Sequence, residues 1–213
     1  MRSYILMVRP KTIENRAEQI LVAADELFAR YGYERTSIED IAKHLGISKG
    51  SVYLDFKTKQ DILIQILLRH GERIIGLMEK RLNNIKGSPL QALKDALEES
   101  ALVVYDKVSS DFHTPETLLH TSMEMKKSHC KDFVIRQRQL LIRFLEQAAA
   151  ANEIKKSVAN EETAMIIKMG VASLFPPYVE ATEPGIPLTR EILQANARKL
   201  LSILIEGLRT YKS

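Results

Sequence analysis

Apolar residues recur at steps of three and four along most of the chain, and glycine and proline residues separate the segments that carry this pattern. Near the N-terminus the repeat falls on Ile20, Ala24, Leu27, Phe28 and Tyr31. Such a repeat places apolar side chains along one face of an α-helix. No segment shows a convincing run of alternating, β-branched residues between turn signals, as a strand would. The sequence therefore predicts an all-α protein.

Helix caps and helix breakers set the boundaries of the expected helices. These helices cover residues 14–31, 36–45, 48–54, 58–85, 90–109, 117–127, 131–152, 161–175 and 189–211. We expect a flexible N-terminal arm at residues 1–12. A three-helix N-terminal domain of the helix-turn-helix type follows at residues 13–58, and a larger helical domain covers residues 59–213.

The sequence between the first and the fourth expected helix has the spacing of a helix-turn-helix unit. Thr36 and Glu39 match a capping box, in which each side chain accepts a hydrogen bond from the backbone N–H of the other residue. Ala42 is small enough for two helices to cross closely, Gly46 suits the positive φ of the turn, and Val52 is expected to pack between the helices. The alternative is an ordinary helical hairpin, which also needs glycine and small residues.

Lysines stand in the first turns of the third and fourth expected helices, although the helix dipole favours anions there. Lys49 and Lys59 therefore predict an external anion, and DNA phosphates would supply it. Gly50 lacks a side chain and would let the backbone approach closely. The expected DNA-binding residues are Thr36, Ser48, Lys49, Gly50, Ser51, Tyr53 and Lys59. In the alternative interpretation the lysines are merely solvated, and Tyr53 is an aromatic residue at the edge of the core.

Composition agrees with a DNA-binding role but does not establish it. The chain has 213 residues, with 31 basic and 27 acidic side chains, a formal charge of +4 and a pI near 9.1. This balance suits a polyanionic partner. The single cysteine, Cys130, excludes an internal disulfide framework and predicts a reducing, cytoplasmic location. The apolar run at residues 4–8 is too short for a membrane span or a secretory signal.

Histidines and the cysteine in the middle of the chain do not form a recognisable catalytic or metal-binding motif. They are His113, His120, His129 and Cys130. Their spacing does not place two ligands one helical turn apart on the same face, and the chain has no paired cysteines and no glycine-rich phosphate loop. We therefore expect no enzymatic activity, no metal ion and no cofactor.

Residues 32–63, GYERTSIEDIAKHLGISKGSVYLDFKTKQDIL, resemble the DNA-binding domain of the tetracycline-repressor (TetR) family of transcriptional regulators. The resemblance implies a homodimer whose two reading helices enter successive major grooves of a palindromic operator in double-stranded DNA. It also implies repression that an unknown small-molecule effector relieves. Asp55 departs from the family pattern, which more often has His or Tyr there. Its carboxylate would repel phosphate unless it is turned away or paired with Lys57.

The resemblance implies that residues 59–213 form an effector-binding and dimerisation domain. Two apolar stripes predict the dimer interface: Ala164, Ile167, Val171 and Leu174 in one, and Leu193, Ala197, Leu200, Leu204 and Leu208 in the other. The alternative is that both stripes close the core of the monomer. The aromatic and adaptable residues expected to line the effector site are Tyr105, Met123, Met125, Phe144, Phe175 and Tyr178.

Two glycines, Gly71 and Gly76, fall inside the fourth expected helix, where glycine is unfavourable. They predict either a bend that couples effector binding to DNA release or a close crossing with another helix. At the level of function one alternative also stays open. The chain could be a helical ligand-binding or enzymatic protein in which the helix-turn-helix serves structure only.

Overall fold

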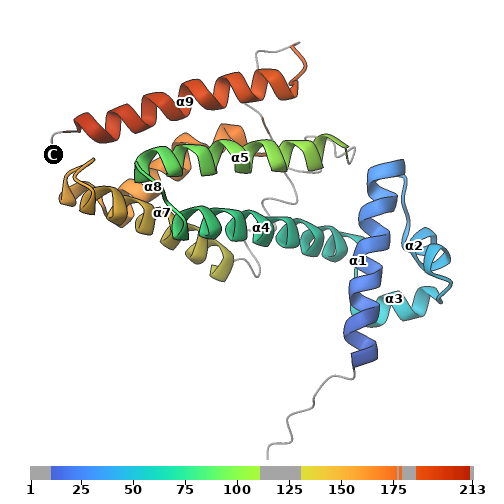
Figure 1. The fold of residues 1–213 in the computed structure, drawn as a ribbon. Coiled ribbons are helices and arrows are strands. Elements are labelled where there is room, and N and C mark those ends of the chain that lie inside the picture. The colour runs from blue at the N-terminus through green and yellow to red at the C-terminus, as the bar shows by residue number, and fades with distance from the viewer. Residues whose placement is uncertain (1–10, 111–130, 177, 179–185, 212–213) are drawn as a thin grey trace, which may run out of the picture. The chain divides into compact units, whose positions relative to one another are not determined.

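The computed structural model describes residues 11–110, 131–176, 178 and 186–211. Helices dominate these residues and no strand occurs among them, so the all-α prediction is confirmed (Figure 1). The chain divides into two compact units, Met1–Ile66 and Leu67–Ser213. The division falls within helix α4 (Lys59–Asn83), whereas the sequence placed the domain boundary at the start of that helix.

The first unit is built from α1 (Lys11–Tyr31), α2 (Ile38–Leu45), α3 (Lys49–Asp55) and the first turns of α4. Its core consists of the apolar side chains that the helical repeat placed on one face of each element. They are Ile20, Ala23, Ala24, Leu27, Phe28, Ile38, Ile41, Ala42, Val52, Phe56, Ile62, Leu63 and Ile66. Val52 has no exposed surface, as expected for the residue that packs back between the helices.

The cap of α2 differs from the expected one. The capping box joins Ser37 and Asp40 rather than Thr36 and Glu39. The backbone N–H of Ser37 donates to Oδ2 of Asp40 at 2.8 Å, and the N–H of Asp40 donates to Oγ of Ser37 at 3.1 Å. Hydrogen bonds from Ser37 lower the pKa of the Asp40 carboxyl group. Gly46 ends the helix with a φ of +65°, the left-handed conformation predicted for the turn.

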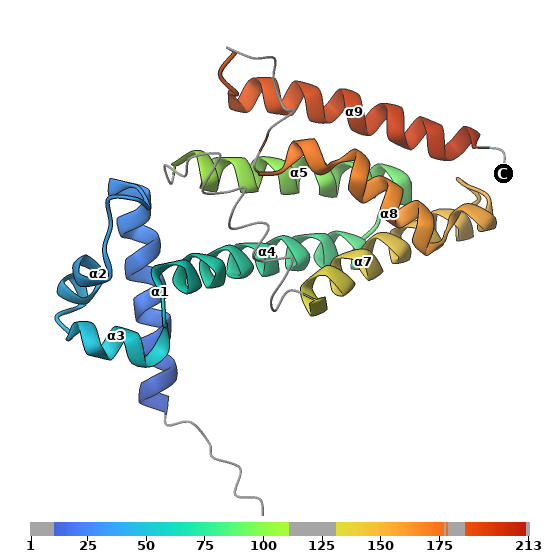
Figure 2. The same cartoon turned by 180° about the vertical axis from the view of Figure 1, so that it is seen from behind.

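The second unit contains the rest of α4 together with α5 (Pro89–Ser110), α7 (Lys131–Ala150), α8 (Glu161–Gly170) and α9 (Arg190–Thr210). Short 3₁₀ turns occur at Lys156–Val158 and Ala172–Leu174. In Figure 1 and Figure 2, α5 runs alongside α9 and α7 runs alongside α8. The helix expected at residues 161–175 ends early, at Gly170, and the 3₁₀ turn at Ala172–Leu174 follows it.

The two glycines of α4 have different surroundings. A Cβ atom added to Gly71 would lie 2.6 Å from Cε2 of Phe133 in α7, which is closer than atoms in contact can approach. Gly76 is exposed, and a Cβ there would have no heavy atom within 4 Å. The arrangement favours the close-crossing interpretation at Gly71. It offers no packing reason for Gly76.

We expect Gly76→Ala to raise the free energy of unfolding by about 0.5–1 kcal/mol, because alanine is the better helix former. Gly71→Ala should instead lower it by about 1 kcal/mol, because overpacking against Phe133 outweighs the gain in helix propensity. Urea unfolding of each variant measures both changes. In a Phe133→Leu background, which removes the outer ring atoms, Gly71→Ala should become stabilising. Equal stabilisation by the two glycine substitutions in the natural background would contradict the close crossing.

Candidate DNA-binding surface and exposed apolar face

Helix α3 begins with a cap that uses one of the predicted DNA-binding side chains. Oγ of Ser48 accepts a hydrogen bond from the N–H of Ser51 at 3.1 Å, and the two hydroxyl oxygens lie 2.8 Å apart. Lys49 is exposed, and its Nζ lies 3.9 Å from a carboxylate oxygen of Glu39. An exposed pair at that distance contributes little stability. The ammonium group of Lys49 is therefore available to an external anion.

The rotation of α3 places one face outward. Val52 points into the core, and at about 100° per residue Gly50 and Leu54 lie on the opposite side of the helix. Tyr53 is 46% exposed, so part of its ring reaches the surface of the unit. Leu54 is 76% exposed and was not among the residues predicted to bind DNA. Its position opposite the predicted core residue Val52 was the signal that could have identified it.

Gly50 is not required by the fold of this unit. A Cβ atom added there would meet only Oγ of Ser48, at 3.7 Å, which is an ordinary van der Waals contact. Its φ is not positive, so no turn demands glycine either. Glycine inside a helix costs about 0.5–1 kcal/mol relative to alanine. Nothing within the described residues requires glycine at this position.

The side chain of Thr36 is not free to make the predicted contact with DNA. It is 3% exposed, and its hydroxyl donates towards the carbonyl oxygens of Gly32 at 2.9 Å and Leu27 at 3.3 Å. Threonine at this position thus satisfies carbonyl groups at the end of α1. Thr36 is therefore a structural residue and not the predicted DNA contact, because its only polar side-chain atom is buried and already bonded.

Lys59 also serves the fold. Its Nζ donates to the carbonyl oxygens of Tyr33 at 2.7 Å and Thr36 at 3.0 Å, and it lies 4.1 Å from the centre of the Tyr33 ring. Partial burial lowers the pKa of the ammonium group. The first turn of α4 has an acid of its own, Asp61, whose carboxylate accepts from the N–H of Thr58 at 2.9 Å. Lys59 therefore acts as a clamp between α4 and the α1–α2 turn, and its role as a phosphate anchor stays a prediction.

Asp55, at the end of α3, forms an ion pair with α1. Nε of Arg16 donates to its Oδ2 at 2.6 Å, and the side chain of Asp55 is only 10% exposed. The partner is Arg16 rather than Lys57, which the sequence had offered. Asp55 is the one acid of α3, so the other side chains that this helix exposes carry no negative charge.

The predicted effector residues that the structure describes belong to the second unit. The hydroxyl of Tyr105 donates to the carbonyl oxygen of Leu188 at 2.9 Å, and its ring lies edge-on to Tyr178 with the ring centres 6.0 Å apart. Phe144 is fully buried in the helical core, and Phe175 packs against the same core. Met123 and Met125 lie outside the described residues. The structure thus brings Tyr105 and Tyr178 together.

The hydroxyl of Tyr178 is buried without a hydrogen-bond partner among the described residues. Burial raises the pKa of this phenol, so the group stays protonated and can donate a hydrogen bond. The residue also has a φ of +56°, which side chains other than glycine seldom adopt. A buried, unpaired donor and an unfavourable backbone conformation are both features that ligand sites retain at a cost in stability.

Most of the predicted dimer-interface side chains close the core of their own unit. Exposed fractions are 5% or less for Ala164, Ile167, Val171, Leu174, Leu193 and Ala197. This corrects the prediction in favour of its alternative, because a side chain buried within one chain presents no surface to a second. Leu200, Leu204 and Leu208 are only partly buried. The exposed apolar residues of α8 and α9 are instead Met165, Ile166, Met169 and Ile203, at 55–67% exposure.

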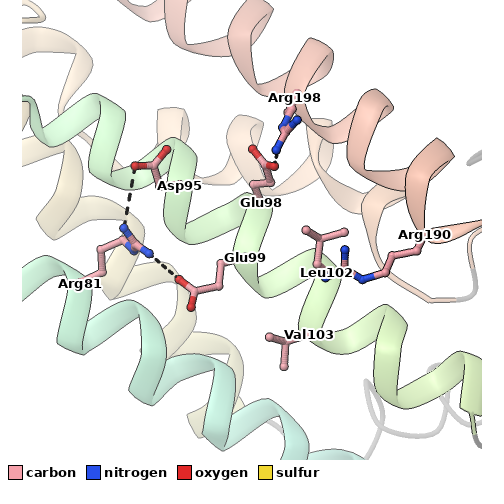
Figure 3. A pocket seen from close by; sticks show the side chains of 8 residues that line it. All are labelled: Arg81, Asp95, Glu98, Glu99, Leu102, Val103, Arg190 and Arg198. Atoms are coloured by element: carbon pink, nitrogen blue, oxygen red, sulfur yellow. Dashed lines mark hydrogen bonds and ion pairs between the residues drawn. The ribbon is translucent and has the colours of Figure 1, made fainter.

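A charged cleft lies between α4, α5 and α9 (Figure 3). Its volume is about 380 Å³, and it is lined by Arg81, Asp95, Glu98, Glu99, Leu102, Val103, Arg190 and Arg198. The arginines and acids are paired across it: Arg81 contacts Glu99 at 2.6 Å and Arg198 contacts Glu98 at 2.8 Å. Arg190 pairs with Asp106 at 2.7 Å. The cleft includes none of the predicted effector residues, and its arginine and acidic side chains pair with one another across the three helices.

Two further findings concern the described part of the chain alone. No group of three or more histidine, cysteine, aspartate or glutamate side chains is placed there to hold a metal ion. None of its helices is both long and apolar enough to cross a membrane. His113, His120, His129 and Cys130 lie outside the described residues.

Residues 20–66 match the family model described as bacterial regulatory proteins, tetR family. The chain is 33% identical over 87 residues to an uncharacterised HTH-type transcriptional regulator, YezE, of Bacillus subtilis, covering 41% of this chain and 44% of the relative. It is 31% identical over 111 residues to a fatty acid metabolism regulator protein of the same organism, covering 52% and 53%. The chain therefore spans about half the length of these curated relatives.

Solved structures extend the similarity of fold along the chain. A transcriptional regulator from Aquifex aeolicus is 27% identical with a TM-score of 0.55, and the match covers 88% of this chain and 98% of that one. A TetR-family regulator from Pectobacterium atrosepticum has a TM-score of 0.73 at 13% identity, with coverage of 96% and 99%, and shows the fold alone. The tetR family match is confined to residues 20–66, and these solved structures extend the similarity of fold to most of the chain.

Proposed function

We propose that this protein is a sequence-specific DNA-binding transcriptional regulator that reads the major groove with α3. The observation that carries the proposal is Gly50, a helical glycine on the exposed face of α3 that the fold itself does not require. DNA is the partner that explains it, because a reading helix without a side chain at that point lies closer to the base edges. The family match over residues 20–66 supports the same function.

The chemistry of α3 fits this role. Lys49 is exposed for a phosphate contact, and the hydroxyl groups of Ser51 and Tyr53 can donate to the DNA backbone. Asp55 does not oppose binding while Arg16 pairs with it. The alternative function, in which the helical hairpin serves structure only, leaves both the glycine and the exposed Tyr53 without a reason.

We further propose that two copies associate through the exposed apolar residues of α8 and α9, namely Met165, Ile166, Met169 and Ile203. A shallow depression of about 280 Å³ adjoins Ile203 and includes Leu200, which gives a second copy room to interlock. A second copy is the expected occupant because helix-turn-helix proteins bind palindromic operators as symmetric dimers.

The effector site is proposed to include Tyr105 and Tyr178. The buried Tyr178 hydroxyl, unpartnered among the described residues, would donate a hydrogen bond to the effector. Effector binding would release the dimer from its operator, so the protein would act as a repressor in the cytoplasm, where bacterial DNA lies. The chemical identity of the effector is open in this proposal.

The dependence of DNA affinity on salt tests the function and separates the two lysines. Lys49→Ala should flatten the slope of log affinity against log salt by about one per protomer, because one phosphate contact is lost. Lys59→Met should leave the slope unchanged and lower the free energy of unfolding by about 1–3 kcal/mol, because it leaves two carbonyl groups unpaired. Fluorescence anisotropy with a selected duplex measures the slopes. Equal flattening by both substitutions would restore Lys59 as a phosphate anchor.

Gly50→Ala should separate stability from DNA binding. We expect the free energy of unfolding to rise by about 0.5–1 kcal/mol, because alanine favours the helix and meets no close neighbour. Operator affinity should fall at least about tenfold, because the added methyl group holds α3 away from the base edges. Urea unfolding and anisotropy are the two measurements. Unchanged operator affinity would show that DNA does not approach α3 at this point.

Ile203→Asp should dissociate the proposed dimer. Because the dimer is symmetric, its interface would bury two new carboxylates, one from each protomer. Each unpaired buried charge costs several kcal/mol, so the dissociation constant should rise at least about a hundredfold. Analytical ultracentrifugation measures the oligomeric state. Val22→Asp, at an exposed apolar residue of α1, is the matched control and should leave the state unchanged. A dimer that survives Ile203→Asp would exclude this face as the interface.

A further inference from the structure

Leu54 has the largest exposed fraction, 76%, of the large hydrophobic side chains that the structure describes. It lies near the end of α3, on the side of the helix opposite the buried Val52. Single exposed leucines are common on protein surfaces and need no special explanation by themselves. The position of Leu54 on the proposed reading helix is what gives it a further meaning.

Gly50 and Leu54 are four residues apart and therefore lie on the same face of α3, one turn from each other. Gly50 has no side chain, and its surroundings would accept a Cβ atom. A surface that approaches the backbone closely at Gly50 meets Leu54 next along this face. On this face of α3, the isobutyl group of Leu54 is then the first side-chain group to reach that surface.

The chemistry of leucine restricts what this side chain can read in DNA. It has no hydrogen-bond donor or acceptor, so it cannot pair with the polar edges of adenine, guanine or cytosine. Thymine alone among the four bases presents an apolar group in the major groove, its C5 methyl group. The apolar contact that Leu54 can make with a base edge is therefore specific for thymine.

We propose that Leu54 is a specificity-determining residue that packs on the C5 methyl group of one thymine in each half of the operator. The proposal rests on the proposed function, because it requires α3 to lie in the major groove. Leu54 then selects a T·A pair at one position, while Lys49, Ser51 and Tyr53 contact the DNA backbone.

The test removes one methyl group from the DNA and nothing from the protein. An operator is first selected from a random duplex pool with the full-length protein, and each thymine is then replaced in turn by deoxyuridine. Burial of one methyl group contributes a factor of about four in affinity. One thymine in each half-site should therefore show about a fourfold loss, and replacement in both halves about a fifteenfold loss. The other replacements should have little effect.

The protein variant identifies the side chain that reads the methyl group. Leu54→Ala should bind the thymine and deoxyuridine operators equally, with a ratio of affinities near one. The fold should tolerate this change, because the residue is exposed and alanine is a good helix former. Val22→Ala removes an exposed apolar group from α1 and should keep the fourfold ratio.

The possible failures are distinguishable. Selection of no sequence above the random pool would overturn the proposed function itself. A selected operator that binds tightly, with no thymine sensitive to deoxyuridine, would leave the function intact and overturn the role of Leu54. Retention of the fourfold ratio in Leu54→Ala would assign the methyl contact to another side chain and would likewise overturn the proposal.

Discussion

The burial of Val52 determines how α3 presents itself to solvent. A helix as short as Lys49–Asp55 has little intrinsic stability, so its conformation depends on packing against the rest of the unit. With Val52 held in the core, the outward positions follow from helical geometry, and they are Gly50, Tyr53 and Leu54. A different rotation would bury Tyr53 and expose apolar core surface. The candidate DNA-binding surface is therefore a consequence of one buried valine.

Polar contacts between the helices of the first unit add to this packing. Arg16 joins α1 to the end of α3 through Asp55, and Lys59 joins the start of α4 to the turn between α1 and α2. Thr36 satisfies carbonyl groups at the end of α1. Each contact connects segments that are well separated in sequence or turns a polar group inward. Their combined effect is to hold a seven-residue helix in a defined position. A reading helix must be positioned within fractions of an ångström for specific contacts.

The second unit follows a similar division between buried and exposed positions. The apolar stripes of α8 and α9 contribute core side chains such as Ala164 and Leu193, while Met169 and Ile203 extend from the same helices into solvent. Both helices are therefore apolar over more than one face. One face closes the unit, and the other has the composition expected of an interface that a second copy would cover.

The sequence by itself determined the all-α class, the positions of most helices, the turn at Gly46 and the outward position of Lys49 and Gly50. These features depend on local patterns, such as helical repeats, caps and glycine, which act over a few residues. Only the tertiary structure decided that Thr36 and Lys59 serve the fold, that Asp55 pairs with Arg16 and that most side chains of the two predicted apolar stripes are buried in their own unit. A polar side chain has several possible partners, and an apolar repeat does not say what covers it. The choice depends on contacts between segments distant in sequence, which exist only once the chain has folded.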